Sequence, residues 1–292
     1  MRSFLRSVKN YFSLVRFSHT VFALPFALIG FSLAIATGEY ESSLKLLLLI
    51  ILCMIFARNA AMSFNRIADN KIDALNPRTK DREIPSGKIS VKAATIFVII
   101  NSLLLITTTA FINRLTLILS PVALMVILGY SLTKRITSLS HFILGLGLSL
   151  APIGAYISVT GIFDVIPVIY SFIVITWVSG FDIIYSLQDE EFDRDNMMRS
   201  IPQATGKKKA LIISSIVHIL TFILVITAGI AGDGGILYWA GAVVFSGLLL
   251  YQHLIVKHDD LRRVNLAFAT MNGIASIAFA VFVISDMFIK II

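Results

Sequence analysis

The sequence predicts an all-α protein: an integral membrane bundle of nine transmembrane helices around a central cavity open to the cytoplasmic side. Composition is the first reason, because 57% of the 292 residues are hydrophobic, only 14% are charged and the mean hydropathy is +0.87. Soluble domains carry far more charge. The other reasons are the long apolar segments and the placement of Lys and Arg between them. No linker or low-complexity stretch interrupts the chain, so residues 1–292 are expected to form a single domain.

Nine apolar segments are long enough to cross the hydrocarbon core of a bilayer, which takes about 20 helical residues. The segment at 115–132 is short and contains Pro121, so its ends are the least well defined. The predicted spans are 17–37, 44–66, 91–111, 115–132, 139–160, 164–187, 209–231, 235–256 and 264–290.

Lys and Arg lie almost entirely on one side of these spans. Of the 25 in the chain, all but Lys45, Arg58, Arg114 and Lys290 fall in the N-terminal tail or at the loops that follow every second span. Cytoplasmic loops carry such an excess. We therefore expect the N-terminus and these loops in the cytoplasm, and the protein in the cell inner membrane. The net charge of +8 reflects this topology, so no nucleic-acid partner is expected.

The first acidic stretch begins inside the second predicted span and ends in a charged loop at Gly87. At about 100° per residue, Asn65, Asp69 and Asp73 lie on one slowly drifting helix face, with Arg58 about 20° from the same stripe. Polar and ionisable side chains in a spanning helix are costly, and they usually face a cavity where they have a function.

The second acidic stretch lies at the cytoplasmic end of the sixth predicted span. Asp182, Asp189 and Asp193 fall within about 20° of one direction on a helical wheel, and Tyr185 lies on the flank of that face. The second pair of aspartates repeats the spacing of the first pair, and four spans separate the two stretches, so both emerge on the same side. This pattern suggests a parallel internal duplication.

Two aspartate pairs at one mouth of a helical bundle predict a site for a hard divalent cation. Carboxylates suit Mg²⁺, which keeps several waters and is usually completed by substrate phosphates. Basic side chains near the same mouth can bind phosphate oxygens. An amphiphilic diphosphate with its tail among apolar helices, such as an isoprenyl diphosphate, fits this arrangement. The basic residues are Arg58, Arg78, Arg82, Lys134, Arg135, Arg194 and Arg199.

Three segments resemble the UbiA superfamily of intramembrane prenyltransferases. NRIADNKIDALNPRT with the downstream REIPSG is similar to its first aspartate-rich motif, and DIIYSLQDEEFD is similar to its second. YSLTKRIT at 130–137 resembles a Tyr-Lys-Arg segment of the same family. The three occur in the family's order, and nine helices is the family's number.

The resemblance implies roles for individual residues. It implies that Asp69, Asp73, Asp189 and Asp193 hold Mg²⁺, and that Asn65 belongs to the first metal-diphosphate site. It implies diphosphate contacts from Lys134 and Arg135, and the position of Arg78 and Arg194 near the same mouth adds them to the expected diphosphate contacts. Asp182, Tyr185 and Arg58 are expected at the reacting end. One position departs from the family, which often has Asp where this chain has Arg66. We interpret Arg66 as a topology or lipid-headgroup residue.

The function expected from these features is transfer of a polyprenyl group from polyprenyl diphosphate to an aromatic acid. The hydroxybenzoate branch makes 4-hydroxybenzoate the first expected acceptor, in respiratory quinone synthesis. A dihydroxynaphthoate of menaquinone synthesis is the alternative, and a cation-coupled transporter is the alternative from another class. Asp182 lies about 10 Å of helix inward of Asp189, and Arg58 lies a similar distance inward of Asn65. Both are therefore expected below the metals, where the acceptor ring would bind. Prenyl length and oligomeric state stay open.

Overall fold

The computed structural model describes residues 10–11, 13–15 and 22–289, and every element in this part of the chain is helical. Eight helices are long and apolar enough to cross a membrane. They are α3 (Leu44–Ala68), α5 (Val91–Ala110), α6 (Arg114–Thr133), α7 (Ser140–Thr160), α8 (Val165–Ser186), α11 (Lys207–Ala231), α12 (Ile236–Ile255) and α13 (Asn272–Ile289), the last preceded by a π-helical turn, η3 (Leu266–Met271).

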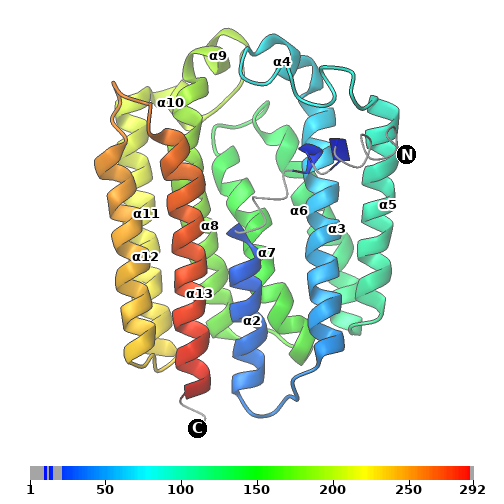
Figure 1. The fold of residues 1–292 in the computed structure, drawn as a ribbon, viewed down its shortest axis with the longest axis vertical. Coiled ribbons are helices and arrows are strands. Elements are labelled where there is room, and N and C mark those ends of the chain that lie inside the picture. The colour runs from blue at the N-terminus through cyan, green and yellow to red at the C-terminus, as the bar shows by residue number, and fades with distance from the viewer. Residues whose placement is uncertain (1–9, 12, 16–21, 290–292) are drawn as a thin grey trace.

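A shorter apolar helix, α2 (Leu24–Ala36), runs beside the long ones (Figure 1). The first predicted span, 17–37, begins outside the described residues, so the count of nine spans stays a prediction. The other eight predicted spans agree with the long helices to within a few residues. The prediction of an all-α membrane bundle is confirmed.

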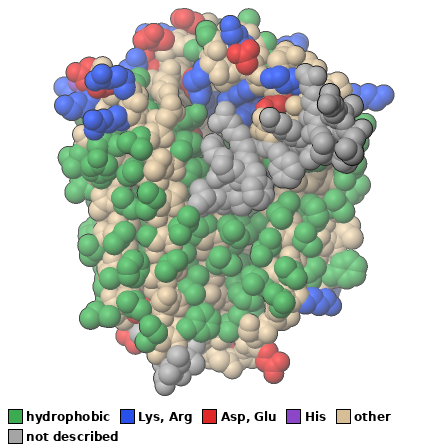
Figure 2. Space-filling view, viewed as in Figure 1, with side chains coloured by type: hydrophobic (Ala, Val, Ile, Leu, Met, Phe, Trp, Pro, Cys, Tyr) green, Lys and Arg blue, Asp and Glu red, His purple; other side chains and the backbone are tan. Residues whose placement is uncertain are grey.

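Four short helices gather at one end of the bundle, at the upper end in Figure 1. They are α4 (Asn70–Leu75), the 3₁₀ turn η2 (Leu187–Asp189), α9 (Glu190–Asp195) and α10 (Ile201–Thr205). Lys, Arg, Asp and Glu side chains crowd this end, while hydrophobic side chains cover the flank below it (Figure 2). The exposed flank includes Leu103, Ile216 and Val243, as expected of a surface that faces lipid.

Polar side chains at the loop–helix junctions explain where several helices begin. The hydroxyls of Ser43 and Ser90 accept hydrogen bonds from the third residues of α3 and α5. Asn113 and Thr116 form a reciprocal capping box at the start of α6, so the segment around Pro121 is a helix with a defined beginning. Each cap satisfies backbone N–H groups that would otherwise lack a partner at the helix end.

The core lies around α8, which packs against α7 and α11. Trp177 on α8 is fully buried and meets the rings of Phe26 and Phe245 at centroid distances of 5.2 and 5.8 Å. Glycine lets α2 and α7 approach closely, because a Cβ on Gly30 would lie 2.0 Å from the carbonyl oxygen of Pro152. This packing fixes α8, whose cytoplasmic end carries the second acidic stretch.

Candidate active site

Both acidic stretches line one cavity of about 190 Å³ beneath the short helices. We call it the polar cavity. It collects the aspartates and the asparagine that the sequence singled out, from the ends of α3 and α8 and the segments that follow them. These residues are Asn65, Asp69, Asp73, Asp182, Asp189 and Asp193.

The helices that carry these residues are interrupted, whereas the sequence predicted continuous helical faces. Asp69 separates α3 from α4 with φ −91° and ψ 3°, and the turn η2 at 187–189 separates α8 from α9. The hydrogen bonds from Asp69 N to Asn65 O and from Asp73 N to Asp69 O persist, at 2.9 and 2.7 Å. The chain therefore bends without losing the four-residue register, and both aspartates still reach the cavity.

Asp69 sits among basic and acidic side chains. Its Oδ2 accepts a hydrogen bond from Asn65 Nδ2 at 3.1 Å, and its Oδ1 lies 3.8 Å from a guanidinium nitrogen of Arg135. Burial and the nearby carboxylate of Asp73 raise the pKa of Asp69, against the opposing effect of Lys134 and Arg135. The folded protein therefore holds this carboxylate at an electrostatic cost that a bound cation would relieve.

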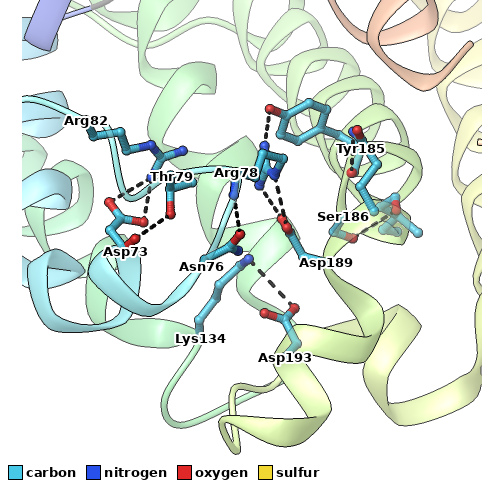
Figure 3. Close-up of polar contacts among 12 residues, drawn as sticks. Asp73, Asn76, Arg78, Thr79, Arg82, Lys134, Tyr185, Ser186, Asp189 and Asp193 are labelled. Carbon is cyan, nitrogen blue, oxygen red and sulfur yellow. Dashed lines mark hydrogen bonds and ion pairs between the residues drawn. The ribbon is translucent and has the colours of Figure 1, made fainter. Parts of the chain in front are cut away.

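Asp73 and Asp189 are each held by an arginine of the loop that follows α4 (Figure 3). Nη1 of Arg82 lies 2.7 and 2.8 Å from the two oxygens of Asp73. Arg78 makes a bidentate contact with Asp189, at 3.1 Å from Nε and 2.5 Å from Nη2, and its Nη1 donates to the Tyr185 hydroxyl at 2.7 Å. The loop of the first acidic stretch is thus bound directly to the second.

Lys134 lines the polar cavity from the loop between α6 and α7, and Arg135, which does not line it, lies beside Asp69. Lys134 Nζ lies 4.0 Å from Asp193 Oδ2 (Figure 3), and Arg135 donates to the backbone carbonyl of Ala68. Burial opposes the charge on Lys134, but the surrounding aspartates, Asp193 foremost, raise its pKa. Lys134 therefore stays protonated and can meet an anion in the cavity.

Arg58 lies apart from the aspartates. It lines a second cavity of about 410 Å³ between α3, α6 and α7, whose walls are almost entirely apolar, and which we call the apolar cavity. Tyr130 and Leu144 line both cavities, so the two adjoin. From their distance along the helices, Arg58 and Asp182 were both expected below the metals. The structure places Asp182 in the polar cavity and Arg58 in the apolar one.

The positions of two basic residues, Arg194 and Arg66, differ from those expected from the sequence. Arg194 does not line the polar cavity; its side chain is 59% exposed and pairs with Glu190 one helical turn earlier. Arg66, interpreted as a topology or headgroup residue, is buried and lines the polar cavity. It points about 100° from Asn65 on the helix, and the packing of the bundle around the end of α3 brings it into the cavity wall.

His141 is a site residue that sequence reasoning missed. It is fully buried in the first turn of α7, and its Nδ1 lies 2.7 Å from Asp182 Oδ2. A histidine at the cytoplasmic start of a predicted span, shortly after the YSLTKRIT segment, was the available signal.

The carboxylates suit a hard divalent cation. Asp69 Oδ1 and Asp193 Oδ2 are buried and accept no hydrogen bond from the described residues. Such oxygens are costly to leave unsatisfied and are available to a cation. No group of three possible ligands clusters tightly within the described part of the chain. A metal here would therefore need further oxygens from substrate phosphate or water, as Mg²⁺ sites usually do.

Comparison with known proteins places this geometry in a family. Residues 23–277 match the UbiA prenyltransferase family. The chain belongs to the UbiA prenyltransferase family. The resemblance seen in the motifs is thereby confirmed, as is the prediction of a prenyltransferase, and the transporter alternative is set aside.

Curated UbiA relatives match along most of their length. A 4-hydroxybenzoate octaprenyltransferase of Aliivibrio fischeri (strain ATCC 700601 / ES114) is 29% identical over 239 residues, 80% of this chain and 81% of the relative. One from Francisella tularensis subsp. mediasiatica (strain FSC147) is 27% identical over 282 residues, 96% of this chain and 98% of the relative.

Solved UbiA structures share the fold. The apo structure of a UbiA homolog from Aeropyrum pernix K1 has a TM-score of 0.80 and 28% identity, covering 94% of this chain and 98% of the homolog. A UbiA homolog from Archaeoglobus fulgidus bound to GPP and Mg²⁺ has a TM-score of 0.70 at 20% identity, covering 95% of this chain and 99% of the homolog.

Proposed function

We propose that this UbiA-family enzyme transfers a polyprenyl group from polyprenyl diphosphate to a hydroxylated aromatic acid, with 4-hydroxybenzoate as the first expected acceptor. One observation carries the proposal: a polar cavity lined by aspartates and basic residues adjoins an apolar cavity through Tyr130 and Leu144. A diphosphate head and an apolar tail need these two environments side by side. The curated relatives named 4-hydroxybenzoate octaprenyltransferase support the choice of acceptor.

The diphosphate would lie in the polar cavity. Asp69, Asp73, Asp189 and Asp193 would hold Mg²⁺, which supplies Lewis-acid stabilisation of the charge that develops on the departing diphosphate. The homolog bound to GPP and Mg²⁺ supports this choice of metal. Lys134 faces the same cavity, and Arg135 lies at its edge beside Asp69.

Binding of the diphosphate and metal would require Arg78 and Arg82 to change partners. In the structure their guanidinium groups neutralise Asp189 and Asp73. Both guanidiniums could turn from the carboxylates to phosphate oxygens, which offer the same bidentate geometry. Arg194, exposed and paired with Glu190, would reach the diphosphate only after a change in its side-chain position.

The transfer breaks one bond and forms one. The C1–O bond of the prenyl diphosphate breaks, and its electron pair leaves with the diphosphate, so the prenyl group becomes an allylic cation. A ring carbon ortho to the acceptor hydroxyl attacks C1 and forms the new C–C bond, and the ring then loses one proton. Asp182 lies in the cavity wall with its side chain 19% exposed, positioned to accept a proton as a general base. Tyr185 lies beside it.

The acceptor carboxylate would meet Arg58. This guanidinium lines an otherwise apolar cavity next to Tyr130, and an aromatic acid is a chemically suitable ligand there. An aromatic ring bound between Arg58 and Asp182 would place its carboxylate toward the first residue and its hydroxyl toward the second. The cavities that these two residues line adjoin at Tyr130.

The active site would face the cytoplasm from the cell inner membrane. The acidic motifs lie at the end of the bundle where Lys and Arg gather (Figure 2), and such an end is cytoplasmic by the positive-inside rule.

An assay with purified protein and radiolabelled polyprenyl diphosphate in Mg²⁺ tests the proposal. We expect label to enter 4-hydroxybenzoate. Label that enters a dihydroxynaphthoate in preference to 4-hydroxybenzoate would assign the alternative acceptor. Absence of transfer to either aromatic acid, with prenyl diphosphate binding intact, would overturn the proposed function.

A further inference from the structure

The imidazole of His141 is hydrogen-bonded through both nitrogens. Nδ1 lies 2.7 Å from Asp182 Oδ2, and Nε2 lies 3.3 Å from the backbone nitrogen of Ile201. A backbone N–H can only donate, so Nε2 is the acceptor of this pair. The ring proton therefore resides on Nδ1, from which it is donated to Asp182, and the imidazole is neutral.

Hydrogen bonds also join the backbone on both sides of the ring to neighbouring segments. The hydroxyl of Ser179 on α8 lies 2.6 Å from the Ile175 carbonyl oxygen and 3.2 Å from the His141 carbonyl oxygen, so its proton is shared between the two. Two residues before Ile201, the backbone N–H of Arg199 donates to the Lys134 carbonyl at 2.7 Å. Ile201 begins α10, whose first turn is capped by Ser200. His141 thus joins Asp182 to the segment before α10, which is itself bound to the loop that carries Lys134.

His141 lines neither cavity, whereas Asp182 lines the polar one. The histidine side chain is fully buried, and that of Asp182 is 19% exposed. The hydrogen bond to Asp182 is therefore the direct contact between the His141 ring and the wall of the polar cavity.

We propose that His141 is a positioning residue that fixes the rotamer of Asp182 by occupying Oδ2, so that Oδ1 is presented to the aromatic acceptor. The inference rests on the proposed function, in which Asp182 takes the proton lost from the acceptor. That proton passes to Oδ1, which turns the carboxylate into a carboxylic acid, while the Nδ1 proton stays on His141. A neutral donor holds the carboxylate without adding positive charge to the cavity.

A matched pair of amides at position 141 tests this role. The amide nitrogen of asparagine can take the place of Nδ1, while the amide oxygen of glutamine can take the place of Nε2. His141→Asn therefore keeps the donor to Asp182, and His141→Gln keeps the acceptor for Ile201 but loses that donor. We expect His141→Gln to lower kcat for the aromatic acceptor by about 10-fold or more, and His141→Asn to retain most of it.

Prenyl diphosphate affinity in Mg²⁺ and the thermal unfolding temperature are measured for both variants. We expect the affinity to be unchanged, because His141 does not line the diphosphate site. His253→Gln is the control, since His253 is hydrogen-bonded to His218 and Ser215 and lines neither cavity. It should leave kcat unchanged. Adding His141→Gln to Asp182→Asn should cause no further loss, because the histidine acts through the aspartate.

Equal kcat for the Asn and Gln variants, or a further loss when His141→Gln is added to Asp182→Asn, would overturn the positioning role while leaving the proposed function intact. A wild-type protein that transfers to neither aromatic acid would remove the proposed function, and this inference with it.

Discussion

Two carboxylate oxygens in the polar cavity, Asp69 Oδ1 and Asp193 Oδ2, are buried and accept no hydrogen bond from the described residues. Their nearest basic nitrogens are on Arg135 and Lys134, at 3.8 and 4.0 Å, too far for hydrogen bonds. A buried anionic oxygen without a donor is costly. A bound cation, or a hydrogen-bond donor of the substrate, would satisfy these two oxygens and remove that cost.

Neutralising one carboxylate of each aspartate pair tests metal dependence. Asp69→Asn or Asp189→Asn removes a charged oxygen while keeping the side-chain shape. We expect turnover to fall by at least about 10²-fold, the scale of losing several kcal/mol of transition-state charge stabilisation. Turnover with titrated Mg²⁺ and with excess chelator is the measurement.

Asp81→Asn is the control for these variants, because Asp81 is exposed on the loop that follows α4. Its turnover should match that of the wild type. Full activity of the Asp69→Asn, Asp189→Asn double variant, or activity that survives the chelator, would contradict the metal assignment.

The adjacent basic residues Lys134 and Arg135 permit a test of diphosphate recognition. Arg135→Ala and Lys134→Ala should each weaken prenyl diphosphate binding by about 10-fold, in line with the loss of a charge-assisted hydrogen bond. Arg135→Lys should recover only part of the loss, because lysine lacks the planar fork. Affinity is measured by titration in Mg²⁺, with Arg263→Ala on an exposed loop as the control. Unchanged affinity in both alanine variants would remove these residues from the diphosphate site.

At the scale of elements, α8 organises the site. Its buried side packs against α7 and α11, and its cytoplasmic end runs into η2 and α9, which present the second pair of aspartates. Close helix contacts depend on glycine: a Cβ on Gly145 of α7 would lie 2.5 Å from the Ile175 carbonyl oxygen on α8. Since the first turn of α7 carries His141, the spacing of these two helices sets the distance from His141 to Asp182.

Substitution of Gly30 tests the contact between α2 and α7. A Cβ at this position would lie 2.0 Å from a backbone oxygen of Pro152, and a backbone atom cannot move aside as a side chain can. We expect Gly30→Ala to lower the unfolding temperature in detergent by about 5 °C or more. Gly247→Ala on α12 is the control, because nothing lies within 4 Å of its added carbon. An unfolding temperature for Gly30→Ala equal to that of the control would contradict the packing.

At the scale of the molecule, charge and apolar surface are segregated. The flank of the bundle is apolar, and basic and acidic side chains collect at the end that bears α4, α9 and α10 (Figure 2). In a bilayer the apolar flank contacts the lipid chains, and the charged end lies in water at the membrane surface. The substrate head would therefore be bound at the membrane surface, while its tail stays at the depth of the hydrocarbon core.

Thiol labelling tests the orientation. Cys53 is the one cysteine of the chain, so Cys53→Ser provides a background without thiols. Lys80→Cys lies on the exposed loop after α4, and Glu39→Cys lies on the exposed turn between α2 and α3 at the opposite end. A membrane-impermeant thiol reagent added to intact cells should modify the second variant and not the first. The reverse pattern would place the active site on the outer face.

Hydropathy and helical period depend on residues near one another in the chain, so the sequence by itself determined the membrane class, the helical bundle and the two aspartate faces at one end. The register of Asn65, Asp69 and Asp73 survives the break in their helix because the four-residue hydrogen bonds continue through it. The motifs also indicated the family, because the whole pattern lies within short segments.

Which side chains meet across those segments was decided only by the tertiary structure. Arg78 reaches Asp189 and His141 reaches Asp182 because helix packing and loop closure bring distant parts of the chain together. Arg194 turns outward to Glu190, although its neighbour Asp193 faces the cavity, because adjacent helical residues point about 100° apart. Arg66 is buried because the bundle closes around the end of α3. Burial and cross-chain pairing depend on the complete packed bundle, and no local pattern encodes them.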